Sequence, residues 1–108
     1  MITTHVLDTA RGKPAAGIPI TLEWRGDVWE PAGTGVTDAD GRCRDILQRP
    51  RTVGVWRLRF DVAGYFAALG VESFYPSVEI CFEVRDAAQH YHVPLLIAPF
   101  GYSTYRGS

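Results

Sequence analysis

Three histidines lie in two short segments of this 108-residue chain, and they are the side chains best suited to acid–base chemistry. His5 lies in "THVLD", and His90 and His92 lie in "HYHVPLLI". In a strand, side chains two residues apart share a face, so His90 pairs with His92 and His5 shares its face with Thr3 and Leu7. The three imidazoles would meet if the two strands lie near each other, in one subunit or across an interface.

Clustered histidines are compatible with three interpretations. Neutral imidazole is a good zinc ligand and a His-x-His strand pair offers two ligands on one side, although no carboxylate or thiolate is obviously placed to complete such a site. A histidine pKa near neutrality also suits general acid–base catalysis. The third interpretation is that each histidine is simply a hydrogen-bonded strand residue.

Two arginines are candidates for holding a ligand. Arg42 follows "TDADG", a tight Asp-Gly turn that would begin a strand and fix the position of the Arg42 guanidinium. The alternative is that Arg42 is a solvated hairpin arginine. Arg106 lies in "YRGS", the last four residues, and a planar guanidinium binds a flat, oxygen-rich ligand through paired hydrogen bonds that lysine cannot make. Cys43 lies between two arginines, which favours a low thiol pKa, but strand alternation puts it on the opposite face. We therefore expect no catalytic cysteine.

Alternating apolar and polar side chains predict the strands that must position these groups. The pattern is clear in residues 18–24, 54–60 and 77–85, and one-sided strands of this kind are typical of antiparallel sheets. The side chains expected to face the core are Ile18, Ile20, Leu22, Trp24, Trp56, Leu58, Phe60, Val78, Ile80, Phe82 and Val84. Turn sequences recur between these segments, which suggests a sandwich or barrel.

One segment departs from the strand pattern. Residues 61–70, "DVAGYFAALG", favour a short helix, with Asp61 as its amino-terminal cap and Gly70 at its end. The sequence therefore predicts an all-β fold of about seven or eight strands with one short helix. Its length suits a single domain over residues 1–108.

Bulk composition excludes several classes of partner. Hydrophobic residues make up 46% and charged residues 21% of a chain with net charge −1, so no basic surface recommends nucleic acid. No apolar run is long enough to cross a membrane, and "MITTHVLD" lacks the features of a secretory signal, so we expect a cytoplasmic protein. Two cysteines are too few for a disulfide scaffold and match no zinc or redox spacing, which predicts free thiols.

Five segments together resemble the 5-hydroxyisourate hydrolases, the transthyretin-related enzymes of urate breakdown. They are "ITTHVLDTARGKPAAGIPITLEW", "TDADGRC", "RLRFDVAGYFAALG", "FYPSVEICFEV" and "HYHVPLLIAPFGYSTYRGS". The resemblance covers essentially the whole chain. The closing Tyr-Arg-Gly-Ser is the feature that separates this hydrolase family from transthyretin, the hormone carrier of the same fold.

The resemblance implies a transthyretin-like two-sheet β-sandwich that forms a homotetramer, with active sites between dimers. It also implies hydrolytic opening of the six-membered ring of 5-hydroxyisourate to 2-oxo-4-hydroxy-4-carboxy-5-ureidoimidazoline, without a metal or organic cofactor. The apolar segment "VPLLIAPF" is consistent with a subunit interface, although a strand buried within its own subunit would have the same apolar sequence.

The same resemblance assigns roles to individual residues. The catalytic set is His5, Arg42, His92 and Ser108, the substrate-binding set is Tyr105, Arg106 and Gly107, and His90 is a supporting residue. In this hypothesis the histidines activate a water and the arginines stabilise negative charge developing on oxygen. Gly107 is expected to let the backbone turn at positive φ.

A non-catalytic carrier is the main alternative. A transthyretin-like protein would bind a small aromatic ligand in the same channel without hydrolysing it, but it would have no need of converging acid–base groups. A purely structural β-sandwich module would leave the histidines without a role.

Overall fold

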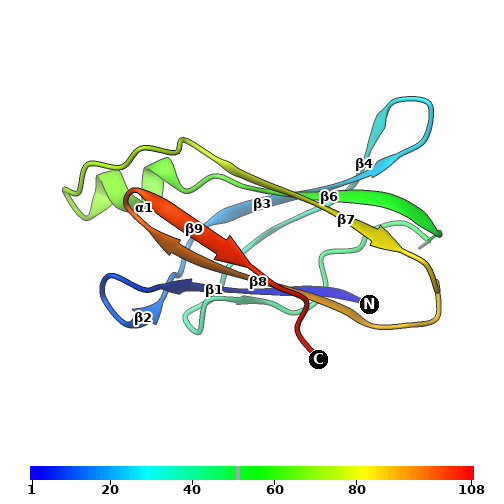
Figure 1. Ribbon diagram of the computed structural model, residues 1–108, viewed down its shortest axis with the longest axis horizontal. Helices are drawn as coiled ribbons and strands as arrows, with labels where there is room; N and C mark the ends of the chain where they lie inside the picture. The colour runs from blue at the N-terminus through cyan, green and yellow to red at the C-terminus, as the bar shows by residue number, and fades with distance from the viewer. Residues whose placement is uncertain (51) are drawn as a thin grey trace.

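The computed structural model describes residues 1–50 and 52–108, and it consists of two β-sheets packed face to face with a short helix at one end (Figure 1). The first sheet contains β1 (Ile2–Asp8), β8 (Tyr91–Ala98) and β9 (Gly101–Thr104), and the two-residue strands β2 (Lys13–Pro14) and β5 (Arg42–Cys43) both pair with β1. The second sheet has the order β4 (Trp29–Val36), β3 (Pro19–Arg25), β6 (Gly54–Phe60) and β7 (Val78–Val84). The predicted two-sheet, all-β architecture is confirmed.

The strands expected from alternation correspond to β3, β6 and β7, which pair antiparallel as predicted. Their apolar faces form one core with the inward side chains of β8. Trp56, Leu58 and Phe60 of β6 are completely buried, whereas Trp24 and Phe82 are only partly buried against the core. The described residues contain nine strands rather than seven or eight, because β2 and β5 are only two residues long and too short to leave a periodic signal.

The helix α1 (Ala63–Ala68) lies within the predicted segment. The expected cap at Asp61 is wrong: Val62 is the residue at the N-cap, no side chain caps the helix, and the Asp61 carboxylate instead lies 3.7 Å from Arg59. Gly70 does follow the helix end, in a left-handed conformation with φ 69°. Among residues 1–50 and 52–108, no helix has the length and hydropathy that crossing a bilayer requires.

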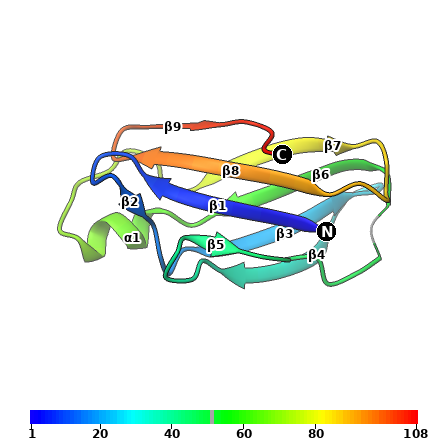
Figure 2. The same ribbon diagram turned by 90° about the horizontal axis from the view of Figure 1, so that it is seen from below.

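The pairing of β1 with β8 decides where the functional side chains lie. The two strands are parallel, with Thr3 beside His92 and His5 beside Pro94. On its other edge β1 pairs with β5, which puts Arg42 beside His5. Figure 2 looks onto this sheet, with β1 between β8 and β5 and the second sheet behind. The two histidine segments therefore meet within one chain, as the sequence allowed.

Candidate functional site

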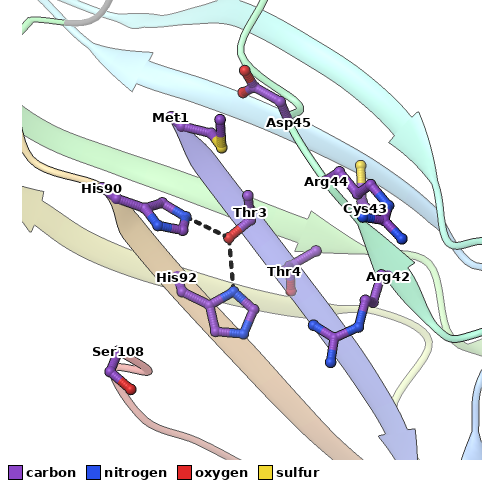
Figure 3. A pocket seen from close by; sticks show the side chains of 10 residues that line it. All are labelled: Met1, Thr3, Thr4, Arg42, Cys43, Arg44, Asp45, His90, His92 and Ser108. Atoms are coloured by element: carbon purple, nitrogen blue, oxygen red, sulfur yellow. Dashed lines mark hydrogen bonds between the residues drawn. The ribbon is translucent and has the colours of Figure 1, made fainter.

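A cavity of about 490 Å³ opens beside the first residues of β1 and β8, within the size range of small-molecule sites (Figure 3). Its lining comes from β1, the β5 segment, the start of β8 and the carboxyl-terminal tail. The lining residues are Met1, Thr3, Thr4, Arg42, Cys43, Arg44, Asp45, His90, His92 and Ser108. Four residues that the sequence singled out are thus brought together around one space: Arg42, His90, His92 and Ser108.

The hydroxyl of Thr3 links the two histidines of the β8 segment. Thr3 Oγ1 lies 2.7 Å from Nδ1 of His92 and 2.9 Å from Nε2 of His90, as the dashed lines in Figure 3 mark. Thr3 is only 9% exposed. Because a hydroxyl has one proton to donate, at least one of the two ring nitrogens must donate to it.

Burial, above all, lowers the pKa of His92 below the ordinary value of 6.5. The positive charge of Arg42 and the neighbouring His90 and His5 act in the same direction, whereas hydrogen bonding with the Thr3 backbone raises the pKa. His92 therefore keeps its neutral form to lower pH than an ordinary histidine. Neutral imidazole is the form that accepts a proton, so His92 is suited to act as a base.

His5 belongs to the same face but does not line this cavity. Its Nε2 donates to the backbone carbonyl of Asp40 at 2.9 Å, and because a carbonyl only accepts, Nε2 must carry the ring proton. His5 also pairs in register with Arg42. Its other nitrogen, Nδ1, is therefore the one that can accept a proton.

The turn before β5 positions both Arg42 and the partner of His5. The Asp38 carboxylate accepts from the backbone N–H groups of Arg42 at 3.0 Å and Asp40 at 2.9 Å. These bonds, with that from Arg42 the largest cause, lower the pKa of Asp38 and keep it ionised. Gly41 has φ 75°, and a Cβ there would collide with the carbonyl of Val6. The predicted Asp-Gly turn thus fixes the backbone from which the Arg42 guanidinium reaches the cavity.

The carboxyl-terminal tail continues the pairing of β9 along β8. The N–H of Gly107 donates to the carbonyl of His92 at 2.9 Å, in the register that β8 and β9 already share. The expected positive φ at Gly107 is wrong, since this residue is not among those with a left-handed backbone. It lacks a side chain for another reason: a Cβ would lie 2.5 Å from Cδ2 of His92. The close approach lets Ser108 reach the cavity.

Tyr105 and Arg106 do not line the first cavity. They line a second one, of about 330 Å³, which lies between the tail and β7 and shares His92 with the first. The guanidinium of Arg106 lies 4.6 Å over the ring of Tyr91 and donates to Oε1 of Gln89 at 3.2 Å. Within this chain, these contacts hold the tail against the start of β8.

The remaining candidate chemistries receive little support. Burial is the largest cause that raises the pKa of the Cys43 thiol, so this residue stays protonated and unreactive near neutral pH. Across the described ranges, no group of three or more His, Cys, Asp or Glu side chains is arranged to hold a metal ion. Thr3 is the functional residue that the sequence did not assign, although its place on the His5 face was visible.

A model of the HIUase/Transthyretin family matches residues 2–107 of the chain. The chain belongs to this family. A 5-hydroxyisourate hydrolase of Caulobacter vibrioides is 45% identical to it over 112 residues, which cover 99% of this chain and 97% of the relative. The solved structure of Klebsiella pneumoniae 5-hydroxyisourate hydrolase is 38% identical, with a TM-score of 0.87, and the match covers 99% of this chain and 98% of that one.

A solved transthyretin has the same fold as this chain. Sea bream transthyretin, solved in complex with thyroxine, is 29% identical with a TM-score of 0.91, over 98% of this chain and 93% of that one. Because the hydrolase and the transthyretin match the backbone about equally well, the fold alone does not separate the two kinds of protein. The site residues must do so.

Proposed function

We propose that this chain is a 5-hydroxyisourate hydrolase, which uses water to open the six-membered ring of an intermediate of urate degradation. One observation carries the proposal: a chain 45% identical to a relative of that name groups a neutral imidazole, a guanidinium and a hydroxyl around one cavity. These are the groups that amide hydrolysis without a protein nucleophile needs, because water must be deprotonated and an oxyanion stabilised.

His92 is the proposed general base. It takes a proton from water as the water oxygen bonds to a carbonyl carbon of the substrate ring. It then returns that proton to the substrate nitrogen as the carbon–nitrogen bond breaks. The lowered pKa of His92 supports this role, because the ring is ready to accept a proton at neutral pH. His5 is a second catalytic residue in this proposal. From β1, where it pairs with Arg42 of β5, it would orient the water or the substrate.

Arg42 and Ser108 complete the proposed reaction site. The guanidinium of Arg42 would stabilise the negative charge that develops on the carbonyl oxygen, and its fixed turn means that little reorganisation is needed during the reaction. Ser108 would hold the substrate with its polar groups. Gly107, which has no side chain, allows the tail to pass close to His92 and so places Ser108 at the cavity.

Five further predictions accompany this proposal. Substrate binding by Tyr105 and Arg106 stays a prediction, and the second cavity that they line beside His92 is the place where it would occur. A homotetramer with sites between dimers, a cytoplasmic location and action of residues 1–108 as one domain also stay predictions. His90 is the supporting residue, through its contact with Thr3.

A transthyretin-like carrier is the second candidate, favoured by the backbone similarity to the thyroxine-bound transthyretin. The ionisable side chains that line the cavity argue against it, because a binding site for an apolar aromatic ligand has few convergent groups of this kind. They are Arg42, Arg44, Asp45, His90 and His92.

The two functions are separated by one pair of assays. Urate oxidase generates 5-hydroxyisourate from urate in situ, and its ultraviolet decay is followed with and without the protein, beside a variant lacking Arg106 to Ser108. We expect fast decay that the deletion abolishes. Decay at the spontaneous rate from folded protein, together with tight thyroxine binding, would establish the carrier instead.

A further inference from the structure

The contact between Thr3 and two histidines is more than the proposed reaction requires. Thr3 Oγ1 is hydrogen-bonded to Nδ1 of His92 and to Nε2 of His90. Nδ1 is not the nitrogen of His92 that would accept the proton from water. In Figure 3 the other nitrogen of the His92 ring points away from Thr3. Thr3 is buried and lies directly beside His92 in the sheet register, so the contact is built into the backbone pairing.

The direction of these hydrogen bonds determines what His92 can do. If the Thr3 hydroxyl donates to Nδ1 of His92, the neutral ring must carry its proton on Nε2 and cannot accept one there. If Nδ1–H of His92 donates to Thr3, then Nε2 has a free lone pair and can act as the base. The Thr3 proton is then free to go to Nε2 of His90, which satisfies all three groups in one chain of hydrogen bonds.

The proposed role of His92 favours the latter direction, because only a ring with its proton on Nδ1 presents a lone pair at Nε2. Gly107 restricts the ring from the tail side, since it leaves no room between the two residues for a larger group. The tail therefore restricts the orientation of the His92 ring, and the hydrogen bond with Thr3 determines its tautomer.

We propose that Thr3 is a positioning residue that holds His92 in the Nδ1–H tautomer, with its own proton donated to His90. This inference rests on the proposed function, because it explains how His92 would present a lone pair to water. Thr3 touches no reacting atom in this arrangement. It acts through His92, and His90 supports it by accepting the hydroxyl proton and thereby turning the hydroxyl lone pairs toward Nδ1.

Three variants test the role of the hydroxyl in turnover. Thr3→Val removes the hydroxyl at nearly constant volume, and Thr3→Ser restores it. Thr9→Val is the matched control: Thr9 directly follows β1 and also donates its hydroxyl to β8, at the carbonyl of Ile97, but it lies away from the cavity. We expect Thr3→Val to lower kcat about tenfold to a hundredfold, the range seen when an orienting partner of a metal-bound histidine is removed. KM should change less than about threefold, because the base rather than substrate binding is affected.

The tautomer is measured directly in the substrate-free protein. Long-range hydrogen–nitrogen NMR correlations of ¹⁵N-labelled imidazoles distinguish the two neutral forms, and His5→Gln and His90→Gln variants assign the three rings. We expect His92 as the Nδ1–H form in the wild type and in Thr3→Ser, and loss of that preference in Thr3→Val.

The two measurements fail in distinguishable ways. A wild-type His92 in the Nε2–H form, or a Thr3→Val protein with wild-type kcat, would overturn the role of Thr3. If the wild type fails to hydrolyse 5-hydroxyisourate, the proposed function falls, and the nitrogen shifts still decide the tautomer. If Thr3→Val does not fold, the wild-type spectrum alone can refute the proposal.

Discussion

Gly107 lies against the ring of His92, so closely that a Cβ at position 107 would come 2.5 Å from Cδ2 and 3.3 Å from Cγ. Its N–H also donates to the carbonyl of His92. Thr3 contacts the same imidazole at Nδ1. Two segments from different parts of the sequence, the first strand and the tail, therefore set the orientation of one ring.

Replacement of Gly107 by alanine tests this packing. Real Cβ atoms do not approach other atoms to 2.5 Å, so either the ring or the tail must move. We expect kcat/KM for 5-hydroxyisourate to fall about a hundredfold, the cost that a 1 Å misplacement of reacting groups can bring. Gly101→Ala is the control, because a Cβ there meets nothing within 4 Å. Wild-type activity in Gly107→Ala would mean that the ring position does not matter.

The pH dependence of activity follows from the pKa of His92. Because that pKa is lowered, chiefly by burial and then by Arg42, His90 and His5, kcat/KM should fall with decreasing pH only below the ordinary value of 6.5. Arg42→Gln removes one of the opposing positive charges, so an NMR titration should give a higher pKa for His92 in this variant, whereas Arg59→Gln should leave it unchanged. An acid limb at or above 6.5 in the wild type would argue against His92 as the base.

The lowered pKa of His92 also affects the free energy of unfolding of the protein. With a folded-state pKa below the unfolded value, the unfolded chain binds more protons in the interval between them. The contribution of His92 to the free energy of unfolding therefore decreases as the pH falls from about 6.5 toward the folded-state pKa. Above that interval it contributes no pH dependence.

Arg106 is expected to anchor the tail through Tyr91 and Gln89. Arg106→Ala should therefore speed hydrogen exchange at the amide of Gly107, which bonds the carbonyl of His92. Arg59→Ala, which removes an arginine from an exposed ion pair with Asp61, is the control. Unchanged exchange at Gly107 with a much larger KM would instead show that Arg106 binds substrate.

The sheets were predictable because their signal is local. Alternation in residues 54–60 and 77–85 requires only that one face be buried, and both segments are strands of the second sheet. The cap at Asp61 is predicted wrongly because the helix begins at Ala63, which puts Val62 rather than Asp61 at the N-cap position. The parallel pairing of β1 with β8 depends on contacts almost 90 residues apart, which no short pattern encodes.

The site was predictable in its residue types more than in its geometry. Arg42, His90, His92 and Ser108 were identified from chemistry and resemblance, and they line one cavity. Thr3 was not assigned a role, because a threonine in a strand has no distinctive chemistry until the register puts its hydroxyl between two imidazoles. The sequence predicts a role for Gly107 but not its physical reason, since steric contact with the distant His92 ring has no local sequence pattern.

The hydrolysis of 5-hydroxyisourate by the wild type and by His92→Gln is the most direct test of the account. The substrate is generated in situ, its ultraviolet decay is followed, and circular dichroism establishes that both proteins are folded. We predict that the wild type accelerates decay well beyond the spontaneous rate and that His92→Gln lowers kcat at least about a hundredfold, the lower range for loss of a general base. A folded His92→Gln protein with the wild-type rate would contradict the assignment of this cavity as the hydrolytic site.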